Sequence, residues 1–236
     1  MARRPVVELA PGVWRIPLVG DWVNGFAFRD DDGQITLVDF GLKSSATKVL
    51  AALETIGSGP SEVTRILLTH AHPDHAGGAA EISRNTGRAM GIHEADAEYL
   101  MTGKSPPRDT SLLLGRLFNR MGGGGFEAVP VGERLTDGQV LPVNGGLRVV
   151  HTPGHSPGHV AFLHEPTGVL IAGDSIFNVL GMRWSIASFC TDFAMSKETA
   201  HRLMEVEYKI AAFTHGPEIR DNPRAAIGNF LTKHPT

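Results

Sequence analysis

Short apolar runs that end in polar or turn residues recur along the chain and predict a sheet-rich α/β fold. Three of them predict a strand meander, at Val13–Leu18, Asn24–Phe28 and Ile35–Asp39. The Asp30–Gly33 cluster between the last two is typical of a hairpin turn. Apolar positions from Ser44 to Ile56 instead recur at helical spacing, and the strand-like run Arg65–Leu68 follows. Strand, helix and strand in succession imply a crossover, with helices covering the sheet.

The rest of the chain continues this alternation of strands and helices. Residues 76–85 and 94–101 predict helices on either side of a short strand at 89–93. Residues 128–150 are rich in strand formers around two turns and predict a meander in the second half, followed by a hairpin at 160–163 and 169–172. A last strand at 210–214 lies between helices predicted at 196–207 and 223–231. Two halves, each with strands and then a helix, predict two sheets face to face with helices outside.

Residues 102–126 depart from this alternation. Ser105–Pro107 breaks the chain, Ser111–Met121 is an apolar helix-like run, and Gly122–Gly125 predicts a flexible hinge. Two interpretations stay open: a helical insertion packed on the surface, or a mobile cap that supplies an apolar wall to a substrate pocket. We therefore expect one α/β domain over residues 1–236, with a helical insertion at about 102–126 that is a candidate cap.

Composition and charge restrict the expected partners and cellular location of the protein. The formal net charge of -3 provides no electrostatic footprint for nucleic acid or an anionic membrane. A single cysteine, Cys190, precludes an internal disulfide and fits a reducing compartment. The basic start Met1–Pro5 is followed by no apolar run of signal-peptide length, and no stretch approaches the ~20 apolar residues of a membrane span. We expect a cytoplasmic protein with a small-molecule substrate, whose oligomeric state the sequence leaves open.

The loop after the strand at 65–68 carries the densest candidate chemistry. His70, His72, Asp74 and His75 fall within six positions, and the two alternating histidines point to one side of an extended segment. Imidazole nitrogen and carboxylate oxygen are ligands that Zn²⁺ takes, and Fe or Mn accept the same set. One short loop can therefore serve two adjacent metal ions.

Three later strand ends supply further ligand types. His155 lies in a loop punctuated by proline and glycine after the strand-like run 147–150. Asp174 ends the apolar run 168–173, and His215 ends the run 210–214. Each is followed by small or turn residues, so the four strand ends can present their side chains together.

In this order the motifs resemble those of the metallo-β-lactamase-fold superfamily of hydrolases, and the resemblance spans roughly the whole chain. It implies a four-layer αββα sandwich of two mixed β-sheets with helices on the outer faces. It also implies that one metal is held by His70, His72 and His155, the other by Asp74, His75 and His215, with Asp174 between them. Val38–Gly41 is similar to the family's first motif, whose aspartate, here Asp39, supports the signature loop.

This resemblance implies a zinc-dependent hydrolase of a carboxylic ester, thioester or lactone. Two divalent ions, most simply two Zn²⁺, would share a water and lower its pKa to produce hydroxide at neutral pH. Asp74 would be the catalytic residue that orients this nucleophile and passes its proton to the leaving group. Two alternatives remain: a mononuclear iron oxygenase resembling the persulfide dioxygenases, and a non-catalytic binding member of the fold.

Several other side chains have two interpretations. His151 and His159 flank His155 and either orient ligands or pack within the loop. Cys190 is expected to be a buried small apolar residue. Residues 177 and 182–184 either form a substrate wall or anion clamp or belong to a packed loop. His93 is expected at an ordinary strand end, and three histidines are expected on the surface, namely His164, His201 and His234.

Overall fold

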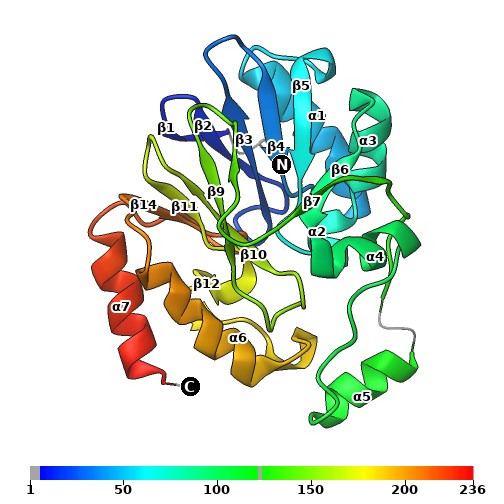
Figure 1. The fold of residues 1–236 in the computed structure, drawn as a ribbon, viewed down its shortest axis with the longest axis vertical. Helices are drawn as coiled ribbons and strands as arrows, with labels where there is room; N and C mark the ends of the chain where they lie inside the picture. The colour runs from blue at the N-terminus through cyan, green and yellow to red at the C-terminus, as the bar shows by residue number, and fades with distance from the viewer. Residues whose placement is uncertain (1–5, 122–123, 236) are drawn as a thin grey trace.

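Two mixed β-sheets lie face to face in the computed structural model, which describes residues 6–121 and 124–235 (Figure 1). The first sheet has the strand order β1-β2-β3-β4-β5-β6-β7, and the second has the order β14-β11-β10-β9-β8. In the first sheet the strands are β1 (Val7–Ala10), β2 (Val13–Pro17), β3 (Asn24–Arg29), β4 (Ile35–Val38), β5 (Val63–Leu67), β6 (Met90–His93) and β7 (Val131–Leu135). In the second they are β8 (Val140–Leu141), β9 (Leu147–His151), β10 (Val160–His164), β11 (Val169–Ile171) and β14 (Ile210–Ala212).

Helices cover the outer face of each sheet. On the first sheet they are α1 (Ala46–Thr55), α3 (Ala79–Thr86) and α4 (Glu94–Thr102), and on the second α6 (Phe193–Thr199) and α7 (Pro223–Lys233). The one-turn helix α2 (Pro73–Ala76) follows the loop after β5. Short 3₁₀ turns occur at Lys43–Ser45, Pro60–Glu62, Gly173–Ser175, Ala187–Phe189 and Ala200–Met204. Among the described residues no helix is both long and apolar enough to cross a bilayer.

Three apolar clusters fill the spaces between these layers. Alternation along β3 directs Phe26 and Phe28 toward the second sheet, where they join Phe162 of β10, while Ala27 faces α1 and its neighbours. Each of these phenyl rings is fully buried, and burying one contributes about 1.5–3 kcal/mol. A third cluster lies between the second sheet and α7. The α/β class and the four-layer αββα sandwich of two mixed sheets are therefore confirmed.

The strand-rich stretch 128–150 is divided between the two sheets, which corrects the prediction of one meander in the second half. β7 pairs in parallel with β6 at the edge of the first sheet, whereas β8 and β9 pair antiparallel in the second. A parallel neighbour requires a crossover connection, and α4 with residues 103–130 supplies it. The apolar pattern predicts the strand but not its partner.

Other boundaries differ by a few residues. The helix expected from residue 76 is two pieces, and Asp74 and His75 lie inside the first, α2. The helix expected from residue 196 begins at Phe193, because Asp192 caps it by accepting from the Met195 backbone N–H. The edge strand β1 and the ribbon of β12 (Ile176–Phe177) and β13 (Arg183–Trp184) have no counterpart in the sequence prediction.

The expected cap contains one helix, α5 (Leu113–Arg120), which Figure 1 shows below α4 and apart from both sheets. Phe118 of α5 packs against Phe189, with ring centroids 5.7 Å apart. Gly122 and Gly123 of the expected hinge, like Met1–Pro5, lie outside the described residues. Movement of this segment stays a prediction.

Candidate metal centre

The first four candidate ligands come from the loop between β5 and α2 and from α2 itself. His72 is extended and precedes the first turn of α2 without a side-chain cap, and Pro73 at the start of the helix sets where it begins. A side chain at Gly77 would lie 2.4 Å from the Pro73 carbonyl oxygen and 2.6 Å from the Lys43 nitrogen. Glycine therefore lets α2 approach the turn after β4, and this fixes the loop from both ends.

Asp39 supports this loop through three contacts. Its carboxylate accepts hydrogen bonds from the Thr69 backbone N–H at 2.9 Å and from the Thr69 hydroxyl at 2.8 Å. It also lies 2.9 Å from Nδ1 of His75, and Nδ1 of His70 lies 3.0 Å from the Thr69 hydroxyl. Because the carboxylate is acceptor-only, Nδ1 of His75 is its donor and Nε2 of His75 is left for another partner.

The remaining candidates come from ends of the second sheet. His155 lies in the loop between β9 and β10, Asp174 follows β11, and His215 follows β14. β11 and β14 are parallel neighbours, so their carboxyl ends present Asp174 and His215 at the same sheet edge. The Thr214 hydroxyl donates to Oδ1 of Asp174 at 2.7 Å, which holds the carboxylate in place.

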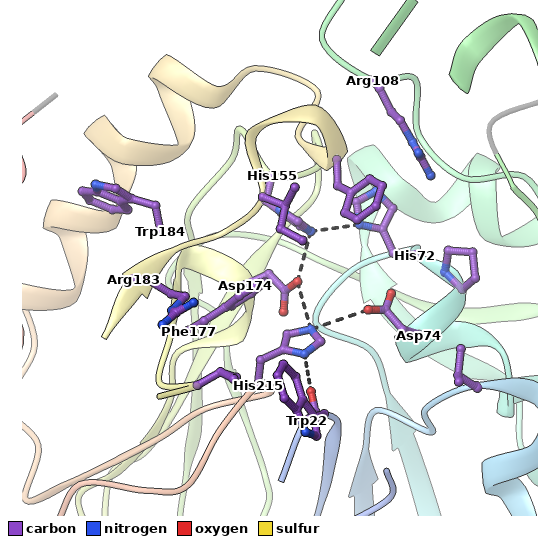
Figure 2. A pocket seen from close by; sticks show the side chains of 15 residues that line it. Trp22, His72, Asp74, Arg108, His155, Asp174, Phe177, Arg183, Trp184 and His215 are labelled. Carbon is purple, nitrogen blue, oxygen red and sulfur yellow. Dashed lines mark hydrogen bonds and ion pairs between the residues drawn. The ribbon is translucent and has the colours of Figure 1, made fainter. Parts of the chain in front are cut away.

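All seven candidates meet between the two sheets, as Figure 2 shows for five of them. Oδ2 of Asp174 lies 3.2 Å from Nε2 of His155 and 3.3 Å from Nε2 of His215, and Oδ1 lies 3.4 Å from Nε2 of His75. Nδ1 of His72 lies 2.9 Å from Nε2 of His155. Three groups have ligand atoms within 4.8 Å of one another, namely His70/His72/His155, His70/His75/Asp174 and Asp74/His75/His215.

The nitrogens that face the centre are chemically suited to a cation. Nε2 of His70, His75 and His215 is buried and has no hydrogen-bond partner within the described part of the chain. The remote nitrogen of each is engaged instead, for His215 with the Trp22 carbonyl. Buried polar atoms are normally satisfied, so a cluster of bare imidazole nitrogens beside carboxylates fits divalent metal ions. The seven residues therefore fit the expected metals.

Three nearby imidazoles stabilise the negative charge of Asp174. Burial disfavours this carboxylate's charge, yet His215, His75 and His155 hold the pKa of Asp174 well below its usual range. Burial likewise lowers the pKa of His155, but Asp174 outweighs burial and raises that pKa to about 10. Burial and the neighbouring His75 hold the pKa of His70 well below its usual range. His70 is thus a neutral imidazole, the form that binds metals.

His159 orients Asp174 through the main chain. The Asp174 backbone N–H donates to Nε2 of His159 at 2.7 Å, and Nδ1 of His159 donates to the Thr152 carbonyl at 3.0 Å. Burial, with the nearby His155, lowers the pKa of His159 to about 3, which keeps the ring neutral and able to accept. Gly173 has φ +57°, and a Cβ there would lie 2.4 Å from this ring. Of the two interpretations of His159, ligand orientation is the one that fits these contacts.

The other flanking residues have structural contacts. His151 donates to the Pro157 carbonyl and stacks on His93 with ring centroids 3.9 Å apart. Sγ of Cys190 lies 3.5 Å from Nδ1 of His155, and the residue is fully buried, as expected. His164 is fully buried between Thr167 and the Asn144 carbonyl, so its predicted surface position is wrong.

Asp96 is a site residue that the sequence prediction missed. It lies on α4, is fully buried, and accepts from the Ala71 backbone N–H at 3.0 Å. It also accepts from the Ser156 hydroxyl and the Gly158 backbone N–H, each at 2.6 Å. One carboxylate thus joins the loop of His70 and His72 to the loop of His155. The only signal in the sequence is an acidic residue on an otherwise buried helix face.

A pocket of about 440 Å³ opens over the centre (Figure 2). Its floor includes His72, Asp74, His155, Asp174 and His215. Its walls are mainly apolar and come from both halves and from the segment before α5: Trp22, Leu42, Pro73, Arg108, Phe177, Val179, Arg183, Trp184, Ile186 and Phe189. The volume suits a small molecule.

Comparisons with known proteins agree with this geometry. The sequence model of the metallo-beta-lactamase superfamily matches residues 22–215, a range that includes all seven candidates. A metallo-beta-lactamase family protein from Thermus thermophilus has a similar structure, with a TM-score of 0.69 and 27% sequence identity, over 96% of this chain and 80% of that one.

Curated relatives match over part of their length. YobT of Bacillus subtilis, an uncharacterized protein, is 30% identical over 148 residues, which are 62% of this chain and 59% of YobT. The probable metallo-hydrolase YflN of the same organism is 29% identical over 187 residues, 73% of this chain and 67% of YflN. A hydroxyacylglutathione hydrolase of Rhodospirillum rubrum is 33% identical over 135 residues, 57% of this chain and 41% of the hydrolase. The chain thus spans less than two thirds of the first and the last of these relatives.

Proposed function

Because the chain belongs to the metallo-beta-lactamase superfamily, we propose that it is a dinuclear zinc hydrolase that cleaves a carboxylic ester, thioester or lactone. The observation that carries this proposal is the pair of three-residue ligand sets on either side of Asp174, at the floor of an apolar pocket. Zinc takes nitrogen and oxygen ligands of this kind, and iron or manganese accept the same set.

In this proposal His70, His72 and His155 hold one ion, and Asp74, His75 and His215 hold the other. Asp174 lies within 3.4 Å of His75, His155 and His215 and would bridge the two. When bound, such a pair polarises a carbonyl group and activates water at neutral pH. Asp39 and His159 would keep the ligands oriented, since they hold the remote nitrogen of His75 and the backbone of Asp174.

Asp74 is our candidate for proton transfer. Its side chain is 38% exposed and lines the pocket, whereas the side chain of Asp174 is only 3% exposed. Oδ2 of Asp74 lies 3.6 Å from Nε2 of His215, so one oxygen faces the ligand set. The carboxylate could accept a proton from the attacking water and deliver it to the leaving group, as a general acid–base group must.

The substrate is expected to be a small acyl compound. The volume and the apolar walls suit a small organic molecule, and a net charge of -3 favours no polyanion such as nucleic acid. The similarity to a protein named hydroxyacylglutathione hydrolase supports hydrolysis of an acyl bond.

Metal content per chain tests the proposal directly. We expect about two zinc ions per chain by elemental analysis of protein purified without chelator, because two ligand sets are complete. The loaded protein should hydrolyse at least one member of a panel of esters, thioesters and lactones. About one iron per chain, with oxygen consumption in the presence of a persulfide, would instead support the iron oxygenase and overturn the hydrolase.

Asp74→Asn tests the proton-transfer role. The amide keeps the size of the side chain but cannot accept a proton, so we expect kcat/KM to fall by roughly 10²–10⁴-fold. Circular dichroism should show a folded variant, and the metal held by the histidine set should remain. Asp31→Asn, in an exposed turn, is the matched control and should retain wild-type activity. A folded Asp74→Asn variant with most of its activity would contradict the role.

A further inference from the structure

Arg108 brings a fixed positive charge to the pocket from the cap segment. Its guanidinium carbon lies 4.5 Å from the ring centroid of Phe118 and 4.7 Å from that of Phe189. In Figure 2 the side chain enters the pocket from the side opposite Arg183 and points toward the floor. Contacts with two rings restrain the plane of the guanidinium, so its position is set before a substrate arrives.

The backbone around Arg108 is held on both sides. Asn119 accepts from the Arg108 N–H and donates to the Arg108 carbonyl, each at 2.9 Å. The Thr191 hydroxyl donates to the Pro107 carbonyl at 2.8 Å, and the Asp109 N–H donates to the Cys190 carbonyl at 2.7 Å. The Thr191 N–H in turn donates to the carbonyl of His155 at 3.1 Å. Arg108 is therefore fixed relative to the metal centre rather than carried on a free loop.

The positive charge of Arg108 interacts with two residues at the floor of the pocket, His72 and Asp74. Burial lowers the pKa of Arg108 and the carboxylate of Asp74 raises it, while Arg108 contributes to lowering the pKa of His72. An arginine remains charged at neutral pH under such conditions. Arg108 lines the same pocket as His72 and Asp74, so this cation can contact a group on a small molecule bound there.

The rest of the pocket wall above the floor is mainly apolar. Trp22, Phe177, Trp184, Ile186 and Phe189 supply apolar surface, and Arg183 at the opposite side is the second lining cation. An apolar body with one anionic end would match this wall, because a guanidinium forms charge-assisted, often bidentate hydrogen bonds to oxyanions.

We propose that Arg108 determines specificity by binding an anionic oxygen group of the substrate, a carboxylate or a phosphate. This inference rests on the proposed hydrolase function and names its substrate class: acyl compounds with an apolar chain and an anionic end. Arg183, which is exposed, is not the principal anion site.

The test compares substrates that differ only in charge. Hexanoyl and adipoyl thioesters of N-acetylcysteamine share a six-carbon acyl chain, and only adipoyl carries a terminal carboxylate. Hexanoyl pantetheine and hexanoyl phosphopantetheine form the phosphate pair. For each pair the ratio of kcat/KM values is measured on one metal-loaded preparation, so differences in folding or metal content cancel. The adipoyl and hexanoyl groups are also offered as oxygen esters.

We expect wild-type protein to favour the anionic member of one pair by about tenfold to a hundredfold. The pair that shows the preference identifies carboxylate or phosphate as the recognised group. Arg108→Gln should bring the ratio close to one through KM, and Arg108→Lys should restore part of it, since lysine keeps the charge without the planar fork. Arg120→Gln, an exposed arginine of α5 outside the pocket lining, should leave the ratio unchanged.

Three results would overturn the inference while the hydrolase stands: no preference in wild type, a preference that survives Arg108→Gln, or one lost in Arg183→Gln instead. An equal loss of kcat on both members in Arg108→Gln would show that Arg108 only positions Asp74, and would overturn it as well. A metal-loaded wild type that hydrolyses neither neutral nor anionic acyl compounds would overturn the proposed function together with this inference.

Discussion

At the scale of single residues, Asp96 shows how one buried carboxylate can align two ligand loops. Both of its oxygens accept hydrogen bonds, one from Ala71 and Ser156 and the other from Gly158. Burial raises the pKa of Asp96 and these donors oppose the change. The side chain is therefore an acceptor at three points, a pattern that no neutral isostere reproduces.

Asp96→Asn should separate the two loops. The amide must turn its NH₂ group toward either the Gly158 or the Ala71 N–H, and a buried donor facing a donor costs about 1–3 kcal/mol. We expect a lower free energy of unfolding in urea and about 10–100-fold weaker metal binding, the usual effect of losing a group that orients ligands. The control is Asp31→Asn. Unchanged metal affinity in a folded Asp96→Asn variant would show that the loops align without this carboxylate.

The sequence predicts the ligand candidates better than their supports. His70, His72, Asp74 and His75 form one compact motif, and strand ends deliver the other three, so the chemistry of the residue types is enough to select them. Asp96 and His164 lack such a signal. Their roles depend on partners at positions 71, 156 and 158 for Asp96 and at 144 for His164, which only the folded chain brings together.

At the scale of elements, α4 joins the first sheet to the metal loops. His93 ends β6 and caps α4, with Nδ1 accepting from the Ala95 backbone N–H at 3.3 Å. Its ring stacks on His151. Burial and the neighbouring His151 lower the pKa of His93 to about 4, although Asp137 opposes the shift. Protonation would remove the cap acceptor and place a positive charge at a helix N-terminus, where it is unfavourable.

This cap predicts acid sensitivity. The pKa of about 4 in the folded protein lies below the ordinary histidine value of 6.5, so the unfolded chain binds more protons between these pH values. Stability from His93 is therefore complete above about pH 6.5 and is lost as the pH falls toward 4. Urea unfolding measures the free energy of unfolding at pH 7 and at pH 4.5. This free energy should fall less between the two pH values for His93→Asn, which keeps a cap acceptor, than for wild type. His201 is exposed, so His201→Asn should behave like wild type. An equal fall in the free energy of unfolding for wild type and both variants would contradict a capping role of His93.

Element types follow from the apolar pattern, but strand partners do not. The signal in residues 131–135 is the same whether the strand joins β6 or β9, because pairing is decided by a crossover that spans α4 and α5. The four-residue β1 and the two-residue β12 are too short for a periodic signal. The helix within residues 102–126 was predictable from Leu113, Leu117 and Phe118, whereas its contact with Phe189 was not.

At the scale of the whole molecule, the candidate centre spans both halves of the sandwich. The loop at 70–75 belongs to the first sheet, and His155, Asp174 and His215 belong to the second. In the proposed function, bound metal ions would therefore cross-link the two sheets in addition to the apolar cluster between them.

Metal removal should consequently destabilise the entire fold. Metal at about 100 times its Kd adds roughly 2.7 kcal/mol to the free energy of unfolding. For a chain of this size we expect chelation to lower Tm by roughly 5–11 °C, about 2–4 °C for each kcal/mol. Differential scanning calorimetry before and after chelation, with zinc added back as the control for reversibility, measures the change. An unchanged Tm after verified metal removal would contradict a cross-linking role.

Because the ligands are divided between the two halves, they are synthesised at different times. His75 leaves the ribosome 140 residues before His215, since their positions are 75 and 215. At about 5–20 residues per second this interval lasts roughly 7–28 s. In the proposed function the set of His70, His72 and His155 is incomplete until His155 is made, 80 residues after His75, and the set of Asp74, His75 and His215 is incomplete for the whole interval. A nascent chain can therefore hold a metal ion only loosely, and full loading must follow translation of the last strand.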